Sequence, residues 1–143
     1  MKRKLLVFTT LLIFTCPSLV FAEAPNYIIE GFKAYEKAGP KEAIERWLRG
    51  SPSEGSQTLL ARANILEQIG DLYGTYQGYD LYKSISVGPR SSIFFIIVYF
   101  ENAPVYSRFV AYKNSSGEVV HRDIDFSTEI DKVWPPNIIY EKE

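Results

Sequence analysis

The chain has 143 residues, 46% of them hydrophobic, with 16 Lys and Arg against 17 Asp and Glu, and it contains one Cys and one His. A chain of this length can bury one adequate hydrophobic core, so we expect a single domain. A single histidine excludes the common zinc sites that use several. The sequence also has no glycine-rich phosphate loop, nucleophile elbow or Walker-type lysine.

The first 22 residues have the layout of a secretory signal peptide. Basic residues at positions 2–4 precede an apolar stretch over 5–16, and Val-Phe-Ala at 20–22 offers a cleavage site. That stretch is about 12 residues long, whereas a membrane span needs about 20. We therefore expect an exported protein, periplasmic or extracellular, without membrane insertion after cleavage. Thr15 precedes Cys16 where lipid-attachment signals have Gly, Ala or Ser, so we expect no lipid.

Cleavage after Ala22 would change the composition of the folded part. It removes three basic residues and no acidic one, which leaves 13 against 17 and a net charge of about −4. It also removes Cys16, so the mature domain can contain no disulfide, thiolate nucleophile or Cys metal ligand. No basic cluster longer than a pair remains. That argues against nucleic acid and anionic lipid as partners.

The first half of the mature chain has helical periodicity. Apolar residues spaced three and four apart predict helices over about 26–37, 40–49 and 56–73. Gly39 and Pro40 separate the first two, and Trp47 lies on the apolar stripe of the second, so it should pack inward. The third helix can end at Gly74, or a turn earlier at Gly70, because an interior glycine costs up to about 1 kcal/mol.

The second half has a period of two and is rich in β-branched and aromatic residues. It predicts strands over about 75–87, 91–100, 105–113 and 118–126. The connections are short, which favours antiparallel hairpins. We therefore expect an α+β fold, with the helices packed on a curved four-stranded antiparallel meander. The domain should cover residues 23–136, and residues 137–143 should form a frayed tail.

The second predicted strand is apolar on both faces. Ile93, Phe95, Ile97 and Tyr99 alternate with Phe94, Ile96, Val98 and Phe100. The helices can cover only one of these faces. The other face then needs sheet curvature, a partner subunit or the C-terminal tail to bury it.

Several runs in the chain resemble a known group of proteins. They are Leu72-Tyr73-Gly74, the strand 94–100, Glu-Asn-Ala-Pro-Val at 101–105, the segment 109–113 and Asp-Phe-Ser-Thr at 125–128. Over about residues 56–132 they resemble small secreted bacterial proteins of unknown function. Three helices followed by a curved meander are similar to the cone-shaped folds of the cystatin-like and nuclear-transport-factor-two-like superfamily. The resemblance implies a fold and no active site, since that superfamily includes enzymes, ligand binders and assembly modules.

His121, Asp123 and Asp125 occupy alternate positions of the last predicted strand, so we expect all three on one solvated face. Neighbours on one face of a strand are about 7 Å apart, which is long for ligands of a single ion. We therefore expect no metal site and no cofactor, although a metal or acid/base site is the alternative. Replacing any of the three by Ala should change stability by no more than about 0.5 kcal/mol.

Aromatic side chains supply the candidate binding residues. The tyrosines between positions 73 and 112 favour core and interface packing, with a ligand cavity as the alternative. The ligand or interface residues that we predict are Phe95, Tyr99, Val105, Phe109 and Tyr79. The turn at 101–102 does not fix the register between the two strands, so the opposite set of side chains remains possible.

These features favour an exported, non-catalytic binding or assembly module. It would form a homodimer or bind another envelope protein through an apolar sheet face or a cavity. A cone-fold enzyme, an isomerase or hydrolase using Asp80, Asp123 or His121, is the alternative from another class. An envelope carrier of a small hydrophobic ligand is a third possibility, and it needs a hollow space between helices and sheet.

Overall fold

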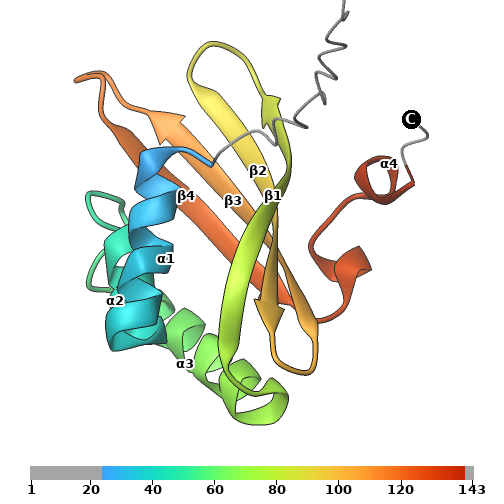
Figure 1. The fold of residues 1–143 in the computed structure, drawn as a ribbon. Helices are drawn as coiled ribbons and strands as arrows, with labels where there is room; N and C mark the ends of the chain where they lie inside the picture. Colours follow the sequence, from blue (N-terminus) through green and yellow to red (C-terminus); the bar gives the residue numbers. More distant parts are fainter. Residues whose placement is uncertain (1–23, 141–143) are drawn as a thin grey trace, which may run out of the picture.

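The computed structural model describes residues 24–140, which form an α+β fold (Figure 1). Three helices come first: α1 Asn26–Ala38, α2 Pro40–Trp47 and α3 Gln57–Tyr73. Four strands follow: β1 Tyr76–Ser86, β2 Ser91–Phe100, β3 Pro104–Lys113 and β4 Val119–Ser127. The described chain ends with a 3-10 turn, η1 Ile130–Lys132, and a short helix, α4 Pro136–Ile139. The predicted fold class is confirmed, and the predicted signal peptide lies outside the described residues.

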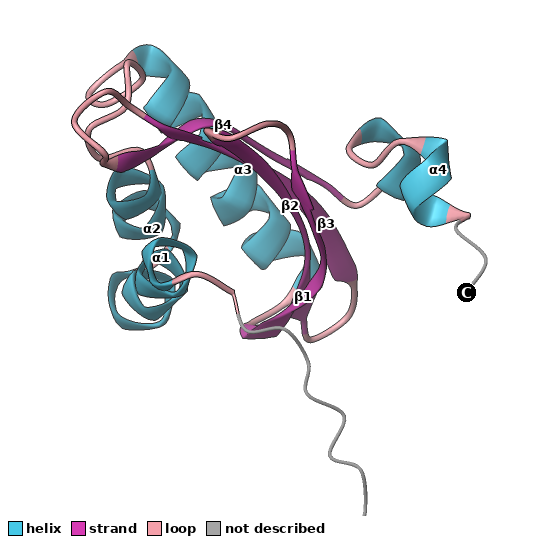
Figure 2. Ribbon diagram, turned by 90° about the horizontal axis from the view of Figure 1, so that it is seen from above, coloured by secondary structure: helices cyan, strands magenta, loops and turns pink. Residues whose placement is uncertain are grey.

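The sheet is an antiparallel meander in the order β1-β2-β3-β4. Its ladders contain three register shifts, two in β1 around Gly78 and Tyr82 and one between β3 and β4 at Val110. Each shift adds a residue to one strand, and bulges of this kind increase the local twist. The sheet is accordingly curved, with α1, α2 and α3 on one side of it (Figure 2).

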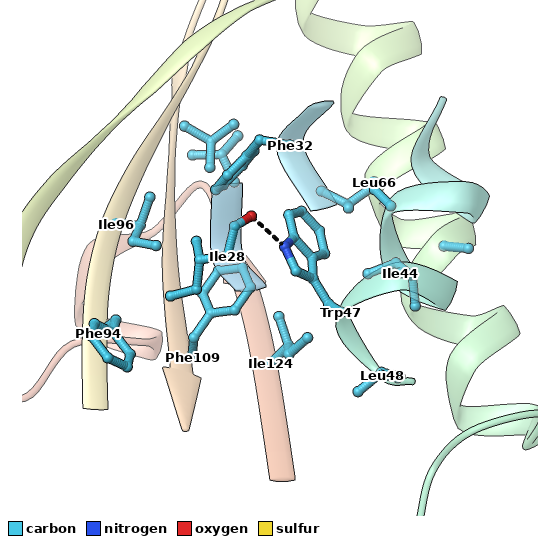
Figure 3. Packing of buried hydrophobic residues seen from close by; sticks show 14 of the residues in the cluster. Ile28, Phe32, Ile44, Trp47, Leu48, Leu66, Phe94, Ile96, Phe109 and Ile124 are labelled. Carbon is cyan, nitrogen blue, oxygen red and sulfur yellow. Dashed lines mark hydrogen bonds between the residues drawn. The ribbon is translucent and has the colours of Figure 1, made fainter. Parts of the chain in front are cut away.

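Aromatic and aliphatic side chains fill the space between the three helices and the sheet (Figure 3). The Trp47 ring lies 4.9 Å from that of Phe32 and 5.0 Å from that of Phe109, measured between centroids, and both contacts are edge-on. Its Nε1–H donates to the carbonyl of Ile28 at 3.0 Å. A Cβ on Gly31 would lie 1.9 Å from the Trp47 Nε1 atom, so α1 can accept the indole only at a glycine. The inward packing predicted for Trp47 is confirmed.

The helix α3 runs through Gly70 and ends at Gly74, the later of the two predicted ends. The N–H of Gly74 donates to the carbonyl of Gly70 at 2.9 Å. Gly74 has a φ of 88°, and a Cβ there would lie 2.7 Å from the Glu101 carboxylate. Backbone sterics and this close approach together make glycine the residue that stops the helix. No helix in the described part of the chain is long and apolar enough to cross a membrane.

The face of the sheet away from α1, α2 and α3 is covered by the end of the same chain. We call residues 128–140 the strap; they contain η1 and α4, and α4 lies on the opposite side of the sheet from the other helices (Figure 2). Val133, Trp134 and Ile138 from the strap form a second buried cluster with Phe95 of β2. Sheet curvature, a partner subunit and the C-terminal tail were the three expected ways to bury this face, and the structure shows the first and the third.

The frayed tail predicted for residues 137–143 is wrong for its described part. Residues 136–139 are helical, and Ile138 is 1% exposed. The prediction failed because the chain continues with apolar residues after Pro136, and these residues complete the burial of β2. Residues 141–143 lie outside the described part.

Candidate functional site

The five predicted ligand or interface residues do not share one surface. Val105 and Phe109 are fully buried against the helices, and Tyr79 stacks on Phe32 at a centroid distance of 3.9 Å. Phe95 and Tyr99 belong to the opposite, strap-covered face of the sheet. The reason is the register, in which Val98 pairs with Val105 and Phe94 with Phe109, so even positions of β2 share a face with odd positions of β3.

Tyr99 is the one exposed member of that predicted set. Its hydroxyl donates to the Asp80 carboxylate at 2.9 Å, and its side chain is 37% exposed. Partial burial is the largest cause that raises the pKa of Tyr99, and the hydrogen bond to Asp80 is the second. Phe95 is only 2% exposed, because its ring packs edge-on against Trp134 at 5.6 Å. The predicted apolar docking surface is therefore already occupied by the strap.

The expectation that His121, Asp123 and Asp125 share a solvated face is wrong. A bulge between the pairs Val110–Asp123 and Ala111–His121 adds a residue to β4 and turns His121 toward the helices. His121 is 2% exposed and lies between the rings of Tyr27, at 5.1 Å, and Phe109, at 5.5 Å. Neither ring nitrogen has a hydrogen-bond partner among residues 24–140, and burial lowers the pKa of His121 to about 4. The imidazole is therefore neutral at physiological pH.

The two aspartates are paired with arginines on the other face. Arg62 of α3 contacts Asp123 at 2.6 Å and Asp125 at 3.5 Å, and Arg108 of β3 contacts Asp123 at 3.2 Å and also binds Asp125. Burial raises the pKa of Asp123, but hydrogen bonds and charge from Arg62 outweigh it and lower the pKa. No group of three metal-ligating side chains occurs among residues 24–140. This network therefore joins α3 to the edge of the sheet and leaves no free carboxylate pair.

A small cavity lies where the first turn of α1 meets the turn of the β1-β2 hairpin. We call it the hairpin pocket; its volume is about 150 Å³. Its polar lining comes from Tyr27, Ser86, Arg90, Ser91, Ser92, Tyr112 and Lys113. The backbone N–H of Lys113 donates to the carbonyl of Arg90 at 2.8 Å, which places these two cationic residues side by side.

The hairpin pocket is positively charged. Arg90 and Lys113 line it, and no carboxylate of the described part of the chain does. The acidic residue of the adjoining β3-β4 turn, Glu118, instead accepts hydrogen bonds from Asn114 and Ser116. Two cations beside several hydroxyl groups can bind an anion through charge-assisted hydrogen bonds.

His121 lies directly behind the wall of this pocket. It pairs with Ala111 across the β3-β4 ladder and touches the Tyr27 ring, and both of these residues line the pocket. Burial raises the pKa of Tyr27, so its phenol keeps its proton and remains a donor. A neutral imidazole adds no repulsion toward a cationic ligand and no attraction toward an anion. The positive charge of the pocket therefore comes from Arg90 and Lys113.

Two other surface grooves differ from the hairpin pocket in charge. The groove between α1 and α2 contains Lys33 and Arg46 together with Glu30, which pairs with both of them. The groove beside α2 and α3 contains Lys41 paired with Glu45. Counting all lining side chains, the first groove has three cations and two carboxylates and the second has two of each, so both mix the two signs, unlike the hairpin pocket.

Sequence reasoning missed the hairpin pocket because its lining comes from α1 and from the ends of four different strands. The available signals were the Ser-rich run after Gly88-Pro89-Arg90 and the Lys113 that closes the next strand. Comparison with protein-family models, with curated proteins and with solved structures found no match for this chain. Its function must therefore be argued from its own residues.

Proposed function

We propose that the protein is an exported, non-catalytic binding module whose ligand site is the hairpin pocket and whose ligand carries a small oxyanion, a carboxylate or a phosphate. The observation that carries this proposal is the pairing of Arg90 and Lys113 in a pocket without carboxylates. Arg supplies a planar fork that matches either oxyanion, and Lys supplies a point charge.

The arrangement of the other polar groups argues against the enzyme alternative. Asp80 is on β1 at one edge of the sheet, and Asp123 is on β4 at the other edge. His121 is buried behind the Tyr27 ring, and its pKa of about 4 is well below the range useful to a general base at neutral pH. These three groups cannot act on one substrate. The carrier alternative is also disfavoured, because aromatic side chains occupy the space between helices and sheet.

The size of the pocket limits the ligand. Cavities that enclose a drug-sized molecule have about 300–1,000 Å³, and the hairpin pocket has about half of the lower figure. It therefore suits a free small anion or the charged end of a larger molecule. A Kd of about 1 mM, or −4.1 kcal/mol, lies within what an anion of five heavy atoms can reach.

Calorimetric titration of the wild-type domain with inorganic phosphate, acetate and neutral acetamide tests the proposal. Ionic strength is held constant with NaCl, so that general screening does not imitate binding. We expect saturable binding of phosphate, acetate or both, and none of acetamide. The first two ligands distinguish a phosphate site from a carboxylate site.

Variants locate the binding. Arg90→Ala combined with Lys113→Ala should weaken anion binding by at least about tenfold, because both charged contacts are lost. Arg122→Ala is the matched control, since Arg122 is an exposed cation on β4 that does not line the pocket. Binding that disappears equally in both, or survives in the double variant, would contradict the assignment.

A further inference from the structure

The strap is held against the sheet by side chains. The Trp134 ring stacks on Tyr82 of β1 at 4.8 Å and meets the rings of Phe95 and Tyr106 edge-on at 5.6 and 5.5 Å. Its Nε1–H donates to the carbonyl of Ser107 at 2.9 Å. We call this site, formed by Tyr82, Phe95, Tyr106 and the Ser107 carbonyl, the tryptophan socket.

The backbone of the strap makes its backbone–backbone hydrogen bonds within itself in the described chain, and its links to the strands involve side chains, such as the Tyr82 hydroxyl that donates to the carbonyl of Ile138 at 3.4 Å. The N–H groups of Val133 and Trp134 donate to the carbonyl of Ile130, and those of Ile138 and Ile139 donate to Pro135. No backbone hydrogen bond between the strap and a strand is present among residues 24–140. The strap is thus held on the sheet through side-chain contacts, and Trp134 occupies the tryptophan socket as a ligand would.

The covalent link between this unit and the sheet is short. Thr128 and Glu129 are the two residues between the end of β4 and the start of η1. Ser127, the last residue of β4, pairs with Tyr106, which is itself part of the tryptophan socket. The chain therefore leaves the sheet and folds back at once onto the neighbouring strand.

We propose that the tryptophan socket is also an interaction surface for a second copy of this chain, whose strap inserts Trp134 in place of the resident one. The same contacts form whether the strap comes from its own chain or from the other copy, and reciprocal insertion gives a closed two-fold dimer. Exchange of an identical element adds no surface that the monomer lacks. The length of the link formed by Thr128 and Glu129 decides between the closed monomer and the exchanged dimer.

Effective concentration sets when exchange occurs. A strap on a short link competes at a local concentration in the millimolar range, so the closed monomer is favoured at micromolar protein concentration. Removing the chain's own Trp134, or shortening the link at Thr128 and Glu129, shifts the equilibrium toward insertion of Trp134 from the second copy. This inference does not depend on the hairpin pocket, which lies at the turn of the β1-β2 hairpin and shares no lining residue with the tryptophan socket.

The test uses the full chain with Trp134→Ala as acceptor and a dye-labelled synthetic peptide of residues 128–140 as probe. Fluorescence anisotropy should show saturable binding of the peptide, at least about tenfold tighter than that of a control peptide with Trp134→Ala. Wild-type protein should bind the peptide weakly, because its own strap fills the socket. Equal binding of both peptides, or no binding, would overturn the proposal.

Deleting Thr128 and Glu129 gives an independent readout. Without these two residues the chain cannot fold back onto its own sheet, so the strap can reach only a neighbouring copy. Sedimentation at micromolar concentration should then show a dimer. Trp134→Ala in the same deletion background should return a monomer. A folded, monomeric deletion variant with Trp134 still shielded from a soluble quencher would overturn the proposal. If the deletion prevents folding, the peptide experiment decides.

Discussion

Acidification should destabilise this protein through His121, the single histidine of the chain. Its imidazole is 2% exposed between the rings of Tyr27 and Phe109, and burial holds its pKa at about 4 in the folded state. In the unfolded chain its pKa returns to about 6.5. Between these two values the unfolded state binds a proton that the folded state does not.

The sign and size of the effect follow from this difference. The free energy of unfolding should fall as pH drops below about 6.5 and stop falling from this cause near pH 4. Each pKa unit is worth about 1.4 kcal/mol, so the complete loss is about 3 kcal/mol. Depressed carboxylate pKa values such as that of Asp123 act in a lower window, because their stabilisation is lost only below about pH 4.

Urea unfolding followed by tryptophan fluorescence, from about pH 7 to about pH 4.5, measures the effect in wild type and in His121→Phe. Phenylalanine keeps a ring in this aromatic site, and it also removes two buried nitrogens without partners. We expect the variant to be as stable as wild type or more so near pH 7, and to lose less stability on acidification. Carboxylate titration is common to both and cancels in the difference. Parallel curves for the two proteins would show that His121 is not the source of the pH dependence.

Three further outcomes are expected. Trp47→Ala should lower the free energy of unfolding, measured with urea, by about 3–5 kcal/mol. Gly31→Ala should lower it by about 1–3 kcal/mol in wild type, because the new methyl would collide with the Trp47 indole. In the Trp47→Ala background the same change should cost little. Equal costs in both backgrounds would show that Gly31 has another role. Trp134→Ala should cost about 3 kcal/mol and expose apolar surface to a reporter dye, and an unchanged melt would contradict the burial of its ring. Intact-mass measurement on exported protein should give a chain that begins at or near Glu23, and acylation at Cys16 would contradict the predicted cleavage.

The sequence was sufficient to predict the first three helices and the four strands because each has a clear period, although it left the end of α3 open between Gly70 and Gly74. Trp47 lies on the apolar stripe of α2 and packs inward as expected. The need to cover both faces of β2 was also readable from its eight consecutive apolar residues, 93–100. What the sequence left open was the covering element. Residues near a chain end are often frayed, and the Trp134-Pro135-Pro136 run gives no helical period that would distinguish a docked segment from a tail.

The candidate sites were harder to predict, because each depends on long-range register. A single extra residue in β4 moves His121 from the solvated face to the core, and nothing in the alternation of 119–126 marks that bulge. The register of the β2-β3 hairpin similarly separates Phe95 from Phe109. The hairpin pocket joins Tyr27 to residues that are about 60 or more positions away in the chain, a proximity that local patterns do not encode.

Backbone amide NMR of the wild-type domain during a phosphate titration at constant ionic strength tests the central claim most directly. We expect saturable shifts confined to the residues around the hairpin pocket, namely Tyr27, residues 86–92, residues 111–113 and Val119. An acetate titration should move the same amides if the site accepts carboxylates. Shifts that stay linear with anion concentration, or that centre on Lys33, Lys37 and Arg46 in the α1-α2 groove, would contradict the hairpin pocket as the binding site.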